Sequence, residues 1–268
     1  MAGCRRVWPV TEPVYDFSER VVVVTGGSRG VGAEIVRRFV DAGAHVVACG
    51  RHEAEVEGAV FMTADVRKPA DAEKVVAKAI EHFGRLDVLV NNAGGAPHAM
   101  AADMSPRFVE AVINLNLLAP LWCAQSAHKV MAVQEDGGCI VNVSSVSGLR
   151  PSPGASAYGA AKAGLINLTT TLAVEWAPLV RLNCVSAGLL DTGAGEEFYG
   201  GPEGLERVAA TVPLGRMGVP ADVAGACLWL ASPGSAYVSG ANVVLHGGGE
   251  WPAFLRAAEA GDGVEAPG

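Results

Sequence analysis

The sequence has few aromatic residues, few histidines and no regular cysteine spacing. Aromatic residues make up 6% of the 268 positions, and the six histidines are scattered along the chain. Neither they nor the cysteines show the spacing of a metal site, so we expect no bound metal. Because several cysteines lie inside apolar segments, we expect free, buried thiols in a reducing cytoplasm. The six cysteines are Cys4, Cys49, Cys123, Cys139, Cys184 and Cys227.

Long apolar segments and an excess of positive charge are also missing. No stretch reads as long and apolar enough to span a membrane, and residues 1–19 lack the apolar core of a signal peptide. The net charge of −8 argues against a nucleic-acid surface. We therefore expect a cytoplasmic protein with neither a membrane nor a nucleic acid as partner.

The composition is that of one large folded domain. Half of the residues are apolar, and neither an internal repeat nor an interdomain linker is present. The pattern indicates an N-terminal extension over residues 1–19, one domain over residues 20–249 and a tail over residues 250–268. In the tail, Trp251 and Phe254 favour a short docking helix.

Expected strands and helices alternate along the domain. Most strand segments are continuously apolar, as expected when helices cover both faces of a sheet. The pattern therefore predicts an α/β fold: a doubly wound, parallel, seven-stranded sheet, the Rossmann fold. The expected strands are residues 20–25, 45–49, 59–63, 86–90, 138–143, 179–185 and 242–245. The expected helices are residues 31–42, 71–83, 105–132, 157–176 and 220–231.

A glycine-rich turn follows the first expected strand. Four valines lead into Thr25, the glycines lie within residues 26–32, and an amphipathic helix follows. Glycines allow the backbone to approach a pyrophosphate, and the helix N-terminus offers free N–H groups to its oxygens. Such a pattern is also found in ordinary strand-turn-helix units, but here the apolar strand and the helix supply the required context.

A tyrosine and a lysine four residues apart, with a serine upstream, suggest acid/base chemistry. Tyr158 and Lys162 share one face of the expected helix, so the ammonium can lower the pKa of the phenol. Ser145 can donate a hydrogen bond to a substrate carbonyl while Tyr158 transfers the proton. Tyrosine and lysine at this spacing more often form a half-buried ring and a solvated amine, so the pair alone does not establish a site.

Taken together, these motifs resemble the short-chain dehydrogenase/reductase family, in its short single-domain form. The resemblance covers about residues 20–249 and also includes the segment 91–94, which matches the family's NNAG motif. It implies a catalytic group of Asn116, Ser145, Tyr158 and Lys162, with Asn116 holding a relay water. It also implies a homotetramer in which the helices near 105–132 and 157–176 form one interface.

The resemblance further implies a set of cofactor contacts. They come from the glycine loop, from the ends of the second to fourth strands, from the catalytic helix and from the segment after the sixth strand. The expected contacts are Gly26, Ser28, Arg29, Gly30, Val31, Gly32, Arg51, Asp65, Val66, Asn92, Ala93, Gly94, Tyr158, Lys162, Gly188, Leu190 and Thr192. One departure is Ala187, which stands where the family has a proline and leaves that turn less rigid.

Charge at the second strand favours NADP(H) over NAD(H). An NAD site usually places a carboxylate there, whereas a 2′-phosphate needs cations. Gly50 occupies the position of that acid, and Arg51 and Arg29 stand nearby in the sequence. We therefore expect two guanidinium groups to hold the extra phosphate.

The sequence predicts an NADP(H)-dependent enzyme that interconverts a ketone and a secondary alcohol by hydride transfer. A 3-oxoacyl thioester is the weakly favoured substrate, and the glycine-dense segment 188–202, with Phe198 and Tyr199, reads as a substrate lid. His98 and His246 are left unassigned. The alternatives are an NAD-dependent alcohol dehydrogenase and a catalytically idle nucleotide-binding module. A sugar-nucleotide epimerase would need a further substrate domain, for which the chain has no room.

Overall fold

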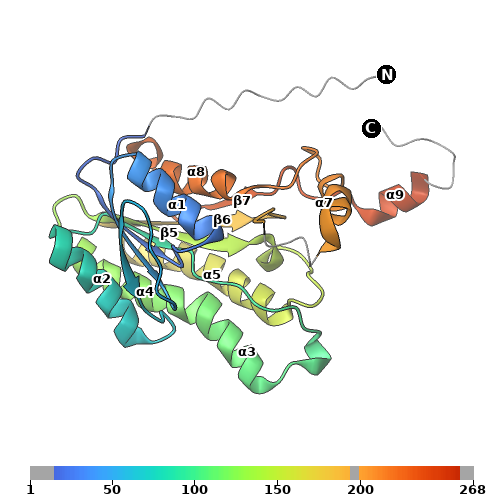
Figure 1. Ribbon diagram of the computed structural model, residues 1–268, viewed down its shortest axis with the longest axis horizontal. Helices are drawn as coiled ribbons and strands as arrows, with labels where there is room; N and C mark the ends of the chain where they lie inside the picture. The colour runs from blue at the N-terminus through green and yellow to red at the C-terminus, as the bar shows by residue number, and fades with distance from the viewer. Residues whose placement is uncertain (1–14, 194–198, 260–268) are drawn as a thin grey trace.

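The computed structural model describes residues 15–193 and 199–259, which form a parallel sheet between two layers of helices (Figure 1). The sheet has seven strands in the order β3-β2-β1-β4-β5-β6-β7, and every neighbouring pair is parallel. The strands are β1 Val21–Thr25, β2 His45–Gly50, β3 Ala59–Thr63, β4 Val88–Asn91, β5 Gly138–Ser145, β6 Val180–Ala187 and β7 Asn242–Leu245. This architecture confirms the predicted doubly wound fold.

Alternate residues of the central strands pack into two separate cores. Val21 and Val23 of β1 join a cluster formed with helices α2, α4 and α5, whereas Val22 and Val24 join a cluster formed with α1 and α8. Because both faces are covered, the first four positions of β1 are all valine. The helices are α1 Gly30–Asp41, α2 Pro69–Phe83, α3 Pro106–Ile113, α4 Ala119–Met131, α5 Ser156–Glu175, α7 Gly201–Ala209, α8 Pro220–Ala231 and α9 Ala253–Glu259.

The strand order indicates a ligand-binding crevice beyond the carboxyl ends of the central strands. The chain runs outward from β1 to β2 and β3, then returns to β4 on the other side of β1. At such a reversal the connections leave in opposite directions, and ligands bind beyond the carboxyl ends of the strands. The predicted motifs after β1, β3, β4 and β5 all lie at that edge.

Some elements differ from the sequence-based prediction. The helix expected over 105–132 is divided into α3 and α4 by a π-helical segment, Asn114–Leu118. Helix α7 was not predicted, and its first two residues belong to the segment 188–202 that was interpreted as a lid. Within that segment, residues 194–198 with Phe198 lie outside the described residues, as do residues 1–14. The expected short tail helix is present as α9.

We predicted that no segment is long and apolar enough to span a membrane. That prediction is wrong, because one helix meets the length and composition criteria. The continuous helix Pro106–Met131 passes that test in the described part of the chain. A single such helix is weak evidence, because core helices of soluble proteins pass the same test. Here α4 packs against α2 and against strands β4 and β5.

Candidate active site

The glycine loop after β1 leaves a space beside the N-terminus of α1. A Cβ atom at Gly32 would lie 2.0 Å from the Gly26 carbonyl oxygen, so this position requires glycine. At Gly30, where φ is +53°, a Cβ atom would meet no protein atom within 4 Å. The first turn of α1 has neither a side-chain cap nor an acidic residue. Its free N–H groups and positive dipole end therefore fit a diphosphate.

The segment after β4 is bound to this loop through Thr25. The Thr25 hydroxyl accepts hydrogen bonds from the backbone N–H groups of Asn92 and Ala93, both at 3.0 Å. The Asn92 amide donates to the carbonyl oxygens of Thr25 (3.0 Å) and Gly26 (3.2 Å). The two predicted cofactor-binding segments thus form one rigid unit. Gly94 extends this unit to the catalytic lysine, since a Cβ atom at Gly94 would lie 3.2 Å from Lys162 Nζ.

The end of β2 leaves little space for an acidic side chain and has free cations nearby. A Cβ atom at Gly50 would lie 3.2 Å from Ser28 Oγ and 3.3 Å from the Phe61 ring. Arg29 and Arg51 are exposed, and neither forms an ion pair with a described residue. The end of β2 therefore has two guanidinium groups without a partner among the described residues, and no carboxylate at position 50.

Asp65, predicted to contact the adenine with Val66, is held by a neighbouring arginine. Arg67 donates to both of its carboxylate oxygens, Nε to Oδ1 at 2.8 Å and Nη2 to Oδ2 at 2.6 Å. The hydrogen bond from Arg67 keeps the pKa of Asp65 below its usual range, despite partial burial. Val66 is buried beside it. Arg67 thus fixes the carboxylate at the predicted adenine position.

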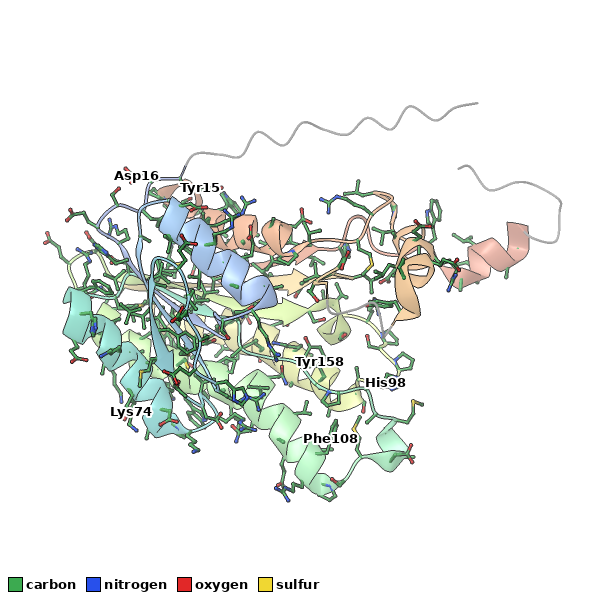
Figure 2. The ribbon with its side chains drawn as sticks, in the orientation of Figure 1. Tyr15, Asp16, Lys74, His98, Phe108 and Tyr158 are labelled. Carbon is green, nitrogen blue, oxygen red and sulfur yellow. The ribbon has the colours of Figure 1, made fainter. Side chains whose placement is uncertain are left out.

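Ser145 and Tyr158 meet at the end of β5. Ser145 is the last residue of β5, its hydroxyl accepts the Ser147 N–H at 3.2 Å, and it lies close enough to the Tyr158 phenol to lower the pKa of that group. Tyr158 lies in the first turn of α5 (Figure 2). The two hydroxyls can therefore reach the same substrate oxygen. Ser145 would donate a hydrogen bond to that oxygen, and Tyr158 would transfer the proton.

Lys162 lies one turn further along α5 and is buried. Its Nζ donates to the Val143 carbonyl oxygen at 2.8 Å and lies 5.6 Å from the centre of the Tyr158 ring. Burial lowers the pKa of Lys162 to about 8, and the nearby Cys184 opposes that shift only in part. A buried amine with a shifted pKa at the crevice is typical of a functional site.

The prediction that Lys162 lowers the pKa of Tyr158 is wrong for the free protein. Burial raises the pKa of Tyr158, and the hydrogen bond with Ser145 reverses that shift only in part. The ammonium group donates to a backbone carbonyl instead of to the phenol. Desolvation is therefore the dominant effect on the pKa of the phenol.

Asn116 lies in the π-helical segment, and its carboxamide is fully used by the protein. Its Oδ1 accepts the Gly95 N–H at 2.8 Å, while Nδ2 donates to the carbonyl oxygens of Gly95 and Val112, both at 2.9 Å. The side chain thus fixes the segment that follows the NNAG motif. Its expected role as the group that holds a relay water stays a prediction.

The segment after β6 is held by backbone contacts at Gly188 and Leu190. Gly188 donates its N–H to the Leu245 carbonyl oxygen at 2.8 Å, and Leu190 pairs with Gly218 in an isolated parallel bridge. Ala187, in the position of the usual proline, ends β6 and is buried. Thr192 is exposed. The predicted contacts of this segment therefore lie at the same edge of the sheet as the catalytic group.

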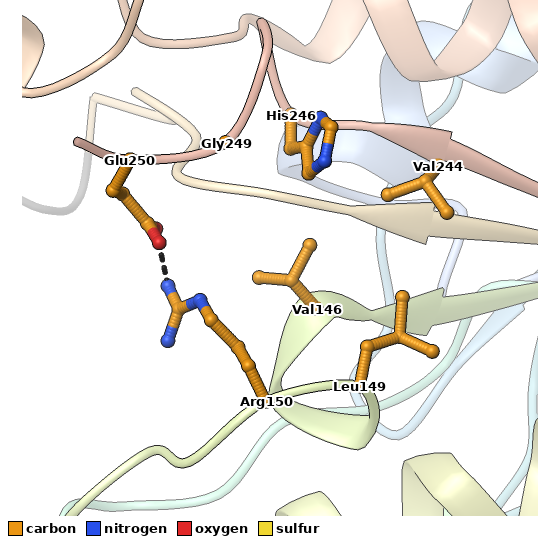
Figure 3. Close-up of a pocket in the computed structure, with 7 residues that line it drawn as sticks. All are labelled: Val146, Leu149, Arg150, Val244, His246, Gly249 and Glu250. Atoms are coloured by element: carbon orange, nitrogen blue, oxygen red, sulfur yellow. Dashed lines mark hydrogen bonds and ion pairs between the residues drawn. The ribbon is translucent and has the colours of Figure 1, made fainter. Parts of the chain in front are cut away.

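Sequence reasoning missed one feature beside this group. Arg150, in the loop after β5, forms an ion pair with Glu250, which follows β7 (Figure 3). The two residues are a hundred positions apart, so local spacing gave no signal of it. Thr25 was also left out of the predicted site, although its position between the strand and the first glycine pointed to it.

Comparison with known proteins agrees with this geometry. A family model described as enoyl-(acyl carrier protein) reductase matches residues 26–250. The probable 2,4-dienoyl-CoA reductase of Bacillus subtilis is 33% identical over 250 residues, which cover 88% of this chain and 98% of the relative. Mouse L-fucose dehydrogenase is 38% identical, with coverage of 87% and 89%. A solved structure of a putative short-chain alcohol dehydrogenase from Sinorhizobium meliloti has a TM-score of 0.81 and 34% identity, with coverage of 88% and 98%.

Proposed function

We propose a specific reaction for this chain on the premise that it belongs to the short-chain dehydrogenase/reductase family and is an oxidoreductase acting on CH–OH or C=O groups. The reaction is the NADP(H)-dependent interconversion of a ketone and a secondary alcohol. The observation that carries the proposal is the grouping of Ser145 at the end of β5 with Tyr158 and the buried Lys162, whose Nζ lies 5.6 Å from the centre of the Tyr158 ring.

Each of these side chains has a defined role in the proposed reaction. When bound, the nicotinamide of NADP(H) supplies or accepts the hydride. Ser145 donates a hydrogen bond to the carbonyl oxygen, and Tyr158 gives the proton to that oxygen in reduction or removes it in oxidation. Lys162 binds the nicotinamide ribose and places positive charge beside the phenol. Asn116 positions the segment that follows the NNAG motif through its bonds to Gly95.

The preference for NADP(H) is supported by the residues at the end of β2. Arg29 and Arg51, which form no ion pair with a described residue, supply positive charge, and Gly50 carries no carboxylate that would repel a 2′-phosphate. An NAD-dependent enzyme would be expected to place an acidic group there.

Replacing Tyr158 with Phe tests the reaction. The change removes one oxygen, so turnover should fall by about 10²–10⁴-fold, the range for losing an acid/base catalyst, while cofactor binding and the melting temperature stay close to the parent. Tyr237→Phe is the matched control, because Tyr237 is fully exposed. Near-normal turnover of the Tyr158→Phe variant on a substrate that the parent accepts would refute the assignment.

We also propose that the chain acts as a homotetramer in the cytoplasm. The interface would include the helix Pro106–Met131 and α5, whose outward faces carry apolar side chains such as Val174, which is 80% exposed. Exposed apolar side chains on a helix face are typical of protein interfaces.

A further inference from the structure

A pocket of about 330 Å³ lies between the loop after β5 and the end of β7 (Figure 3). One wall comes from the loop and the other from the segment that begins in β7. The lining residues are Val146, Leu149, Arg150, Val244, His246, Gly249 and Glu250. The volume is at the small end of the range for ligand sites in proteins.

Both walls of this pocket are continuous with the catalytic group. Val146 directly follows Ser145, and the turn Val146–Gly148 packs closely against α5. A Cβ atom at Gly159, next to the catalytic tyrosine, would lie 2.6 Å from the Ser147 carbonyl oxygen. The opposite wall touches the end of β6, since a Cβ atom at Gly188 would lie 2.9 Å from His246 Cα. The pocket is therefore next to the position of the reacting carbon.

The polar end of the pocket holds a guanidinium and a carboxylate side by side. Arg150 Nη2 donates to Glu250 Oε1, while Nη1 donates to the Pro151 carbonyl oxygen (3.1 Å) and to Ser152 Oγ (3.2 Å). These bonds fix the plane of the guanidinium and leave further N–H donors without an acceptor among the described residues. The Arg150 charge also acts on Tyr199, whose pKa is raised by burial and lowered in part by Arg150.

The opposite end of the pocket is apolar. The side chains of Val146, Leu149 and Val244 point into the space beneath His246, away from the ion pair (Figure 3). Leu149 is 49% exposed and Val244 is 36% exposed, so this wall has apolar surface that a ligand can cover. Burial of such surface against C–H groups is favourable.

We infer that this pocket recognises a polyhydroxylated substrate, a secondary alcohol flanked by further hydroxyl groups such as a sugar or cyclic polyol. The inference rests on the proposed oxidoreductase function and assigns Arg150 and Glu250 as specificity-determining residues. Glu250 accepts hydrogen bonds from hydroxyl hydrogens, and Arg150 donates to hydroxyl oxygens, so adjacent hydroxyls satisfy both. The apolar wall contacts the C–H face of the ring.

The charge balance of the pair decides against two other substrate classes. An anionic group on the substrate would be attracted by Arg150 and repelled by Glu250. Because the ion pair is neutral overall, it offers such a group no net attraction. A long acyl chain would bury the pair without satisfying its hydrogen bonds, which is costly. The pocket thus favours a polyol over the 3-oxoacyl thioester that the sequence weakly favoured.

Two cyclic alcohols that differ by one hydroxyl group test the inference. Oxidation of trans-1,2-cyclohexanediol and of cyclohexanol is followed by cofactor absorbance, with L-fucose and D-glucose as sugar probes and acetoacetyl-N-acetylcysteamine as a thioester in the reductive direction. The parent should use the diol with a kcat/KM about 10- to 100-fold above that of cyclohexanol, as expected for hydrogen bonds to charged groups. Arg150→Gln and Glu250→Gln should each reduce this ratio, mainly through KM.

Three further variants test whether the effect is specific to the Arg150–Glu250 pair. Arg150→Lys keeps the charge but loses the planar fork, so it should lie between the parent and Arg150→Gln. Lys129→Gln and Glu73→Gln change an exposed ion pair elsewhere, at 3.4 Å between α4 and α2, and should leave the ratio unchanged. Melting temperatures close to the parent show that each variant is folded.

The outcomes separate the inference from the proposed function. Turnover of cyclohexanol without preference for the diol, or a ratio that survives both Gln substitutions, would overturn the inference and leave the proposed function in place. If no probe is turned over, saturation-transfer NMR of L-fucose binding decides. Binding that is lost in both Gln variants and kept in Lys129→Gln supports the inference, and the absence of parent binding refutes it.

Discussion

Lys162 is a residue whose burial gives the protein a specific pH dependence. Burial lowers its pKa from 10.5 to about 8. Below pH 8 both the folded and the unfolded chain bind the proton, and the cost of the buried charge is fully present. Between about pH 8 and 10.5 the folded chain releases the proton first, so the free energy of unfolding rises with pH.

We predict that this rise amounts to at most about 3 kcal/mol and disappears in Lys162→Met. Urea unfolding of both proteins at pH 7.5, 9 and 10 measures it as the parent minus variant difference. Subtraction is needed because burial raises the pKa of Cys184 to about 11, which has the opposite effect on stability in both proteins. A difference independent of pH would show that the amine is not desolvated.

Arg51 gives a second prediction at the residue scale. Its guanidinium would meet only the 2′-phosphate, so Arg51→Ala should weaken NADPH binding by about 10- to 100-fold and leave NADH binding unchanged. Fluorescence titration of both nucleotides measures this. Arg37→Ala is the control, because Arg37 is an exposed arginine of α1 that is paired with Glu34 and Asp41. Equal losses for both nucleotides, or a parent preference for NADH, would contradict the NADP(H) proposal.

Residue identities at the site could be predicted from the sequence wherever a local spacing defines the chemistry. Tyr158 and Lys162 are one helical turn apart, so their proximity follows from the helix alone. The pKa of Tyr158 was predicted in the wrong direction, because burial depends on the whole crevice. The pair of Arg150 and Glu250 could not be predicted, since only the sheet topology brings β5 and β7 segments together.

At the scale of elements, the strands were predicted better than the helices. Strands buried on both faces, such as β1, are apolar runs that the sequence shows directly. The π-helical segment Asn114–Leu118 is invisible to periodicity, because it differs from an α-helix only by a shift of one hydrogen-bond partner. Helix α7 begins at Gly201 after Gly200, and these two glycines indicated a loop.

The π-helical segment leads to a prediction about Asn116. Asn116→Ala removes the acceptor of the Gly95 N–H and leaves two carbonyl oxygens without their donor, so unfolding should become easier by about 1–3 kcal/mol. Turnover should fall as well, because the segment after the NNAG motif loses its anchor. Asn114→Ala is the control within the same segment, since Asn114 Oδ1 is buried and has no hydrogen-bond partner among the described residues. Equal destabilisation by both substitutions would show that these bonds to Gly95 contribute nothing.

At the scale of the whole molecule, the oligomeric state is the remaining prediction. Ala163 and Val174 lie on the exposed face of α5, and α5 packs against α3 and the π-helical segment of the helix Pro106–Met131. Burying such a surface in a second subunit would stabilise the assembly by roughly 25 cal/mol per Å² of apolar area, and charges there would oppose it. Light scattering after size exclusion should give four times the chain mass for the parent.

The double variant Ala163→Lys/Val174→Lys should dissociate to smaller species while the fold, followed by circular dichroism, is kept. Val133→Lys is the matched control, because Val133 is 85% exposed but lies in the turn between α4 and β5, away from the outward face of α5. A tetramer that survives the double variant would move the interface to another surface of the molecule, and a monomeric parent would refute the assembly. Since the pocket walls after β5 and β7 belong to one chain, a dissociated variant that keeps its diol preference would further show that each subunit recognises substrate by itself.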